Sequence, residues 1–413
     1  MIQISDKSKC CGCSACFSIC PQNCISMQYD EEGFIYPVVD SKNCIKCKAC
    51  ESVCPFDNKI GVFRESSLYA AVQNMDIGKR MESTAGGAFS LIADFLIDQG
   101  AIVYAVGYDE NVVVCHKSAK TKDGLSEFRG SKYVQSDIGD TYKKINEDIK
   151  AGSMVLFVGT PCQVHGLKKY IGENDRLYTI DLLCLGVSSP ELFRSYIRYL
   201  NEKYESKVVQ IQFRNKQYGY STPNVRVCFS NEKYIEQKYD SKVHANLFFK
   251  HYYNVRPSCY VCEFREVPRV SDFTIGDFTE IGQYSHQMDD DKGTTKLWAH
   301  SRKGRQLIQK LSDGNKVLIL GENISNIVGG PKHQIRLPER RTEFFQDVRI
   351  LEYKDLIKKW APESIKGRIA GIARPIINMF PFGSMFFKQL RALKRIQYNR
   401  QVDELNKLKD VVK

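Results

Sequence analysis

Eight cysteines near the N-terminus form two blocks with the same spacing. Each block reads C-x2-C-x2-C-x3-C-P, and every cysteine of the first block recurs 34 residues later. This doubled run is typical of bacterial ferredoxins with two [4Fe–4S] clusters, in which the fourth cysteine of each block binds the other cluster. The spacing therefore predicts one cluster on Cys10, Cys13, Cys16 and Cys54, and a second on Cys20, Cys44, Cys47 and Cys50.

The alternative for these blocks is a pair of structural zinc sites, because C-x2-C pairs bind zinc in many small domains. Zinc needs four ligands at each site, and it gives no reason for the third cysteine or for the x3-C-P ending. Soft thiolates on a tight loop suit iron–sulfur clusters, with backbone amides facing the sulfides. Cys11 and Cys24 are left over, and we expect them to pack as small hydrophobic side chains.

Composition and length indicate a folded protein of two to four units. The chain has 413 residues, of which 43% are hydrophobic and 26% are charged. Neither a secretion signal nor a run of about 18 apolar residues is apparent, and sixteen cysteines favour metal binding in a reducing compartment. We therefore expect a cytoplasmic location. No nucleic-acid-binding motif accompanies the net charge of +12, so nucleic acid is not an expected partner.

The sequence after Pro55 alternates between strand-like and helical stretches, which predicts a mixed α/β domain from about Leu68. The fold class is thus α+β: a ferredoxin module, a larger α/β domain and a basic helical tail, with boundaries at 1–60, 68–335 and 336–413. Strands are expected at 68–73, 101–107, 154–158, 178–183, 208–213, 224–229 and 273–277, and helices at 87–99 and 190–204.

Six cysteines lie beyond the ferredoxin module, and four of them stand in loop-like contexts. Cys162 and Cys184 each follow an apolar strand, so a parallel sheet would bring these two cysteines to one edge. The alternative is that only the C-x2-C pair binds metal, with zinc as the candidate. Cys115 and Cys228 lie within strands and are expected in the core. The four loop cysteines are Cys162, Cys184, Cys259 and Cys262.

Several segments together resemble the coenzyme F-420 hydrogenase/dehydrogenase beta-subunit family. They are STAGGAFS, FRGSKYVQSDIGDTY, LFVGTPCQVHGLKKYI, YTIDLLCLGVSSPELF, FRNKQYGY and RPSCYVCEF with RVSDFTIGDF. The resemblance spans about residues 1–330, with the ferredoxin fused at the front. It implies FAD and a third [4Fe–4S] cluster, for which the four loop cysteines are the expected ligands. Flavin suits this role because it divides a two-electron hydride into single electrons.

A flavin site is expected around Gly86 and Gly87, which precede a predicted helix whose N-terminus could meet a diphosphate. A simple turn is the alternative. Lys132 would add a charge, and Ser131, Tyr133 and Gln163 stand in segments that match the family. No catalytic residue can be assigned; the candidates for acid–base chemistry are Lys132, His165 and Asp277.

This chain departs from the family pattern at two places. Leu185 follows Cys184 where the family usually has His, and Thr279 and Glu280 follow GDF where it has Trp-Gly. The active site is therefore expected to serve a different donor, so the family name does not assign a substrate.

The C-terminal stretch from Leu351 carries 14 Lys and Arg against 6 Asp and Glu. Residues 367–387 are apolar but interrupted by Arg and Pro, so they cannot span a bilayer as one helix. A basic tail of this kind can lie on an anionic membrane, dock on a partner, or pack back on its own domain.

The sequence thus predicts an iron–sulfur flavoprotein oxidoreductase that relays electrons between a hydride-carrying coenzyme and a redox partner protein. Two alternatives remain. One is a non-catalytic electron-transfer subunit of a separate enzyme, and the other is a member associated with polysaccharide biosynthesis that uses another donor or has lost cofactor chemistry.

Overall fold

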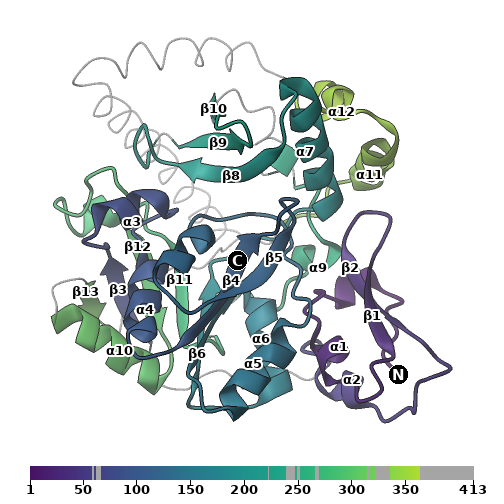
Figure 1. The fold of residues 1–413 in the computed structure, drawn as a ribbon, viewed down its shortest axis with the longest axis horizontal. Helices are drawn as coiled ribbons and strands as arrows, with labels where there is room; N and C mark the ends of the chain where they lie inside the picture. The colour runs from purple at the N-terminus through teal and green to yellow at the C-terminus, as the bar shows by residue number, and fades with distance from the viewer. Residues whose placement is uncertain are drawn as a thin grey trace, which may run out of the picture.

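A small N-terminal unit lies beside a larger one in the computed structural model of the chain (Figure 1). The structure describes residues 1–57, 60–61, 67–221, 223–238, 247–248, 252–265, 269–313, 317–321 and 335–362. The expected domain boundaries at 60, 68 and 335 remain predictions.

The N-terminal unit consists of one hairpin and short helical turns. Strands β1 (Ile25–Tyr29) and β2 (Ile35–Val39) pair antiparallel. The short helices α1 (Ala15–Ile19) and α2 (Ala49–Ser52) each overlap the second half of a cysteine block, and a 3-10 turn, η1 (Lys7–Lys9), precedes the first block. Cys16 lies in α1 and Cys50 in α2, and both pack with Ile25 of the hairpin.

An eight-stranded mixed sheet forms the centre of the larger unit, in the order β13-β3-β12-β11-β7-β6-β4-β5. The neighbours from β11 to β4 are parallel, and all other pairs are antiparallel. This arrangement confirms the predicted mixed α/β fold. The strands are β3 (Leu68–Val72), β4 (Ile102–Tyr108), β5 (Val114–Ala119), β6 (Val155–Gly159), β7 (Leu177–Leu182), β11 (Phe273–Asp277), β12 (Thr295–Ala299) and β13 (Val317–Gly321).

Helices cover both faces of this sheet, because its strands alternate which side chains they present to each face. In β4, Val103 and Ala105 join the core under α4 (Ala88–Ile97) and α10 (Arg302–Asp313). Ile102 and Tyr104 instead join the core under α5 (Thr141–Lys150) and α6 (Pro161–Ile171). The second core also includes Cys13, Ala15 and Val53, so the N-terminal unit packs on the face of α5 and α6 (Figure 1). Shorter elements are α3 (Ile77–Glu82), η2 (Asp123–Phe128), α9 (Pro257–Tyr260) and η4 (Ile281–Gln283).

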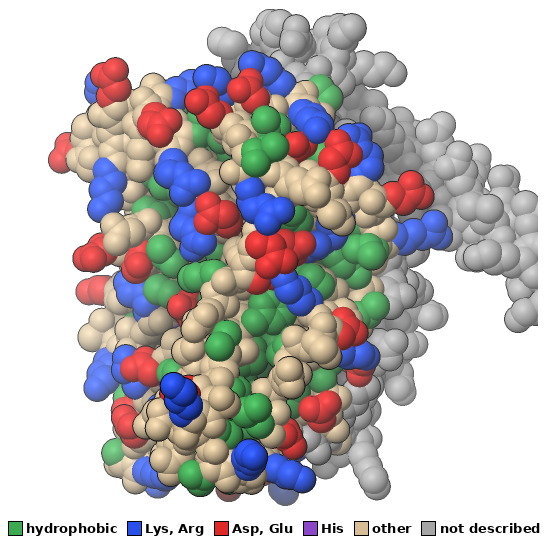
Figure 2. All heavy atoms as spheres, turned by 90° about the vertical axis from the view of Figure 1, so that its right-hand side faces the viewer, with side chains coloured by type: hydrophobic (Ala, Val, Ile, Leu, Met, Phe, Trp, Pro, Cys, Tyr) green, Lys and Arg blue, Asp and Glu red, His purple; other side chains and the backbone are tan. Residues whose placement is uncertain are grey.

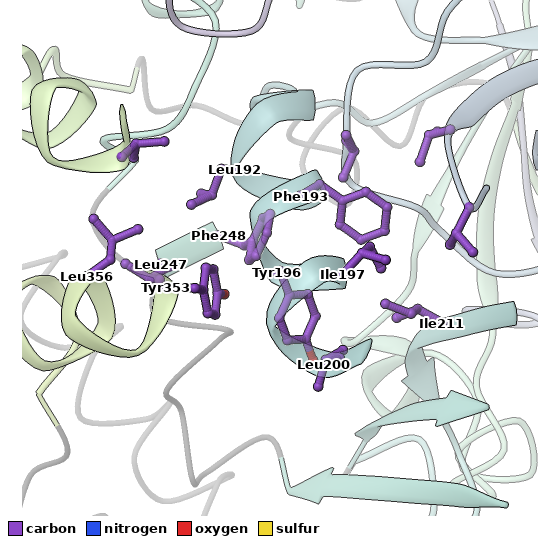
Figure 3. Close-up of a cluster of buried hydrophobic side chains, with 14 of the residues drawn as sticks. Leu192, Phe193, Tyr196, Ile197, Leu200, Ile211, Leu247, Phe248, Tyr353 and Leu356 are labelled. Atoms are coloured by element: carbon purple, nitrogen blue, oxygen red, sulfur yellow. The ribbon is translucent and has the colours of Figure 1, made fainter. Parts of the chain in front are cut away.

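A three-stranded antiparallel sheet lies at the other end of the large unit. It contains β8 (Val208–Asn215), β9 (Asn224–Phe229) and β10 (Tyr234–Lys238), and it packs with α7 (Pro190–Tyr204), α11 (Arg341–Ile350) and α12 (Tyr353–Trp360). Tyr196 of α7 stacks on Tyr353 of α12 with ring centroids 5.3 Å apart (Figure 3). The segment 341–360 is therefore a packed part of the molecule.

The remaining tail predictions, for residues 367–387 and 388–413, lie outside the described residues. Within the part of the chain that the structure describes, no helix is long and apolar enough to cross a membrane.

Candidate iron–sulfur centres and cofactor site

The two cysteine blocks have matching backbone conformations as well as matching sequences. Gly12 and Lys46 have φ angles of 66° and 56°, and Ser14 and Lys48 both have φ of 62°. Each pair is separated by the same 34 residues as the cysteines. The left-handed region is uncommon for residues other than Gly, so the loop shape and not the residue type is what repeats.

The first three cysteines of block one lie close to the last cysteine of block two. Burial raises the pKa of the Cys16 thiol, and the thiols of Cys13, Cys10 and Cys54 raise it further. Burial likewise raises the pKa of Cys54 to about 11, with Cys13 adding to the effect. The structure thus places Cys54 with the first block, and its role as a ligand remains a prediction.

A second pocket gathers Cys20 with the cysteines of block two. Cys20, Cys44, Cys47 and Cys50 all line it, together with Cys24. The Cys24 sulfur lies 3.4 Å from the Cys20 sulfur. Cys24 is buried as expected, but it also contacts predicted ligands, which its role as a small hydrophobic side chain did not anticipate.

A third pocket brings together the four loop cysteines of the larger unit. Cys162 lies in the first turn of α6 after β6, Cys184 follows β7, Cys259 belongs to α9, and Cys262 is the second residue after α9 ends. Cys11 of the N-terminal unit lines the same pocket. Among the described residues, no three His, Cys, Asp or Glu side chains are close enough to share a single metal ion, so the thiols line pockets without converging on one point.

The start of α6 positions Cys162. Thr160 is the N-cap, Pro161 the first helical residue, and Gln163 completes a capping box with Thr160. A hydrogen bond from the Cys11 thiol lowers the pKa of Cys162 to about 7, against the opposing effect of burial. Cys11 lines the third pocket and shares a buried cluster with Cys13, so it lies between the first ferredoxin site and that pocket.

Arg256 joins the same two sites from the other side. Its side chain is fully buried and donates to the carbonyl of Cys10 at 2.8 Å, to the carbonyl of Ile35 at 3.0 Å and to Oε1 of Gln135 at 3.0 Å. Gln135 in turn donates to the carbonyl of Cys11 at 3.3 Å. Gly12 has φ of 66°, and a Cβ there would lie 2.8 Å from the carbonyl oxygen of Ile35, so the loop favours glycine at this position.

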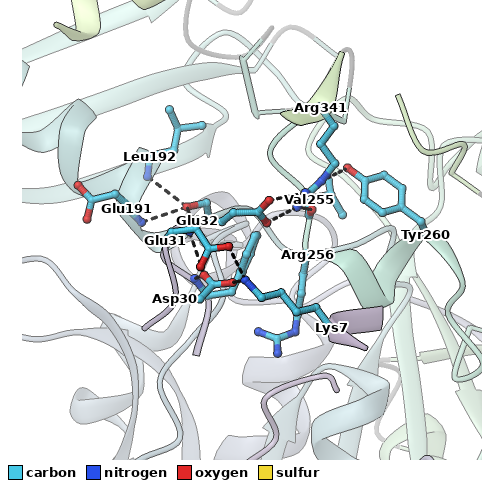
Figure 4. A network of polar contacts seen from close by, with 12 residues as sticks. Lys7, Asp30, Glu31, Glu32, Glu191, Leu192, Val255, Arg256, Tyr260 and Arg341 are labelled. Atoms are coloured by element: carbon cyan, nitrogen blue, oxygen red, sulfur yellow. Dashed lines mark hydrogen bonds and ion pairs between the residues drawn. The ribbon is translucent and has the colours of Figure 1, made fainter. Parts of the chain in front are cut away.

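A second set of contacts fixes the hairpin of the N-terminal unit (Figure 4). Arg341 of α11 makes two hydrogen bonds of 2.6 Å to the carboxylate of Glu32 and one of 3.0 Å to the carbonyl of Val255. The hydroxyl of Ser189, the N-cap of α7, donates to the carbonyl of Glu32. Gly33 has φ of 80°, and a Cβ there would lie 2.4 Å from that of Glu191. The two units thus make close polar contacts.

The two glycines that were predicted to bind flavin, Gly86 and Gly87, have different surroundings in the structure. The Gly86 amide already donates to Thr295 Oγ1 at 2.9 Å, and a Cβ there would lie 2.0 Å from the carbonyl oxygen of Val72. Gly86 therefore allows close packing on the sheet. Gly87 is the N-cap of α4 with φ of 85°, and it lies beside Asn74. Asn74 is 5% exposed, and its Nδ2 has no hydrogen-bond partner among the described residues.

The other predicted flavin residues have partners within the protein. Lys132 is buried and donates to the carbonyls of Glu127 and Arg129 at 2.8 and 3.1 Å, and burial lowers its pKa to about 7. The Ser131 and Thr84 hydroxyls lie 3.0 Å apart. Gln163 caps α6 and lines the third pocket, away from the helix that Gly87 begins.

The acid–base candidates and Tyr133 lie in three different settings. Asp277 pairs with Arg214 at 3.0 Å, and the same guanidinium lies 3.5 Å from the Tyr133 hydroxyl. His165 of α6 accepts a hydrogen bond from the amide of Ile60. Lys132, His165 and Asp277 therefore do not form one catalytic group.

The positions that depart from the family pattern and the two strand cysteines lie at or near the surface. Leu185 is 46% exposed beside the third pocket, and Glu280 pairs with Lys296 at 3.0 Å. Cys115 and Cys228 are half-buried, so the expectation that they belong to the core was wrong.

Sequence reasoning missed Arg256, Gln135 and the position of Cys11. The only available signal was local: Arg256 stands three residues before Cys259, and Gln135 lies within the KYVQSD segment. Neither residue type indicates a contact with a loop more than 120 positions away.

Comparisons with known proteins match both parts of the chain. Residues 9–58 match the 4Fe-4S dicluster domain, and residues 152–321 match the C terminus of the coenzyme F420 hydrogenase/dehydrogenase beta subunit. No curated protein matches the chain. A chain of the F420-reducing [NiFe] hydrogenase complex from Methanosarcina barkeri is 15% identical, with a TM-score of 0.43 over 74% of this chain and 95% of that chain. The two family matches confirm the resemblance found in the motifs: the chain is an iron–sulfur electron-transfer protein related to the coenzyme F420 hydrogenase/dehydrogenase beta subunits, with an N-terminal 4Fe-4S dicluster domain.

Proposed function

We propose that this chain is an iron–sulfur flavoprotein that relays electrons between a hydride-carrying coenzyme and a partner protein through three [4Fe–4S] clusters. The observation that carries the proposal is the third pocket, where four cysteines of the larger unit meet Cys11 of the ferredoxin loop. In this proposal Cys162, Cys184, Cys259 and Cys262 bind the third cluster, because soft thiolates suit iron–sulfur clusters.

The contacts between the units support an order for the relay. Cys11 lines the third pocket with Cys162 and packs in one buried cluster with Cys13, so the first ferredoxin site is the one beside the third pocket. The loop of the second site instead faces solvent, and Cys47 is exposed. Electrons would therefore pass from the third cluster to the cluster of Cys13, then to the cluster of Cys47 and outward, or along the same path in reverse.

In this proposal the larger unit would bind FAD near the start of α4. A diphosphate is stabilised by a helix N-terminus and by hydrogen-bond donors beside it. Asn74 supplies a buried donor next to Gly87 that no described residue uses. Gly86 and Lys132 already have partners within the protein, so we assign them to the support of the site. Bound FAD would exchange two electrons with the coenzyme and pass single electrons to the clusters.

The experiment that tests this function follows electrons from flavin to iron. The full chain is reconstituted anaerobically with iron, sulfide and FAD, the bound flavin is photoreduced with EDTA as the electron donor, and bleaching of the cluster absorbance is recorded. We expect rapid bleaching in the unmodified protein and in Cys115→Ser, a matched control at a half-buried cysteine outside the three sites. Cys184→Ser should retain flavin and bleach much more slowly, because the step between flavin and ferredoxin is lost.

Two results would overturn the relay. If the unmodified protein retains no flavin after desalting, the chain is better described as a non-catalytic electron-transfer subunit. If Cys184→Ser bleaches as fast as Cys115→Ser, the third pocket is not on the electron path.

A further inference from the structure

The two ferredoxin loops have the same backbone shape but opposite surroundings. Every residue from Cys10 to Cys16 is buried, and Cys11, Cys13 and Ala15 share a core cluster with side chains of α5 and α6. In the second loop Ile45, Lys46, Cys47 and Lys48 are all exposed. One half of the repeat is therefore enclosed, and the other forms a surface of the whole molecule.

This exposed loop carries lysine where the enclosed loop carries small residues. Lys42, Lys46 and Lys48 occupy the positions of Ser8, Gly12 and Ser14 in the first repeat. Lys46 and Lys48 adopt left-handed backbone conformations, at which glycine or asparagine would be less strained. Folding alone therefore does not favour lysine at these two positions.

The lysine side chains are available to a partner. Among the described residues, none of the three forms an ion pair or a side-chain hydrogen bond with another residue of the chain. Ile45 lies between them with 60% of its surface exposed, and Val38 nearby in sequence is 45% exposed. On the face that includes the ferredoxin, basic, acidic and hydrophobic side chains are interspersed at the surface (Figure 2).

We propose that Lys42, Lys46 and Lys48, around Ile45 and Cys47, form the docking surface for an acidic redox protein that exchanges electrons with the outer ferredoxin cluster. This inference rests on the proposed relay and adds the chemistry of its partner. A small apolar centre with a charged rim suits a transient electron-transfer contact, in which complementary charge raises the rate of encounter. Steering of this kind weakens as ionic strength rises.

The test compares two pairs of charge reversals with the same change in net charge. K46E/K48E changes the docking surface, and K207E/K233E changes two exposed lysines near the three-stranded sheet. Each reconstituted protein is reduced anaerobically and mixed in a stopped-flow instrument with ferricyanide, with hexaamminecobalt(III), or with a purified flavodoxin chosen for its acidic surface. Absorbance before mixing verifies that the clusters are present and reduced.

We expect K46E/K48E to react with ferricyanide and with the flavodoxin about tenfold more slowly at low salt, and with the cobalt complex faster. K207E/K233E should stay close to the unmodified protein. The variant K46G/K48S, which restores the residues of the first loop, should show a smaller loss and guards against an effect of misfolding.

Equal rates for K46E/K48E and the unmodified protein would overturn the docking surface, and so would equal losses in both reversals, which would indicate net charge alone. Failure of the relay is separable from these outcomes. A protein without the third cluster whose ferredoxin still shows the charge effect would overturn the relay and leave the surface standing.

Discussion

Among single residues, two buried lysines of the larger unit donate to backbone carbonyls. Lys132 donates to two carbonyls, and Lys216 donates to those of Arg80, Ala85 and Lys292 at 2.6 to 2.7 Å. Burial lowers the pKa of both lysines to about 7. Near neutral pH each of these two lysines is therefore only partly protonated. Their hydrogen bonds to carbonyls hold the surrounding loops in place.

The first residue-scale prediction concerns the pH dependence that Lys132 brings. Its folded pKa of about 7 lies below the ordinary value of 10.5, so the unfolded chain binds more protons between these values. Stability should therefore rise with pH across this window, by at most about 1.4 kcal/mol per pH unit from this group. Anaerobic thermal unfolding of the unmodified protein and Lys132→Met at pH 7, 8 and 9 measures it, since Lys216 contributes equally to both. If the stability of both proteins changes with pH by the same amount, burial does not lower the pKa of Lys132.

At the scale of elements, α6 connects two of the candidate iron–sulfur sites. Cys162 and Gly166 are four residues apart and so lie on one face of the helix. Cys162 lines the third pocket, and a Cβ on Gly166 would lie 2.7 Å from the sulfur of Cys13. The helix therefore presents a thiol to the third pocket at position 162 and has no room for a side chain at position 166.

Gly166→Ala tests this arrangement. The added methyl group should overpack the contact with Cys13, cost about 1–3 kcal/mol and reduce the content of the first ferredoxin cluster, as measured by EPR of the reduced protein and by thermal unfolding. Gly78→Ala in α3 is the matched control, because a Cβ there would have a carboxylate oxygen at 3.2 Å as its nearest neighbour. If both variants keep full cluster content and stability, α6 does not position the ferredoxin loop.

Local patterns in the sequence predicted much of the secondary structure, but they did not identify the helices α5, α6 and α10 or the strands β12 and β13. The helix 190–204 and the strands 224–229 and 273–277 agree with the structure at both ends. The two ferredoxin blocks were equally predictable, because the fixed spacing of their cysteines is typical of [4Fe–4S] cluster binding. The contacts of Arg256 and the packing role of Gly86 were not readable, because both depend on segments that only the folded chain brings together.

At the scale of the whole molecule, the ferredoxin is built into the larger unit. Its inner loop packs on α6 and is held by Arg256, and its hairpin is held by Arg341 and Ser189. The outer loop is left at the surface with its lysines. The two halves of the internal repeat thus have different surroundings: the first site lies beside the third pocket, and the second lies at the surface.

A path through three clusters requires that the unmodified chain holds all three of them, and its iron content measures this. After anaerobic reconstitution and desalting, iron and acid-labile sulfide are measured per chain. Three [4Fe–4S] clusters predict about twelve irons with an equal amount of sulfide. About eight irons would show that the dicluster domain is filled while the pocket of Cys162, Cys184, Cys259 and Cys262 holds no cluster, and the three-cluster path would then be wrong.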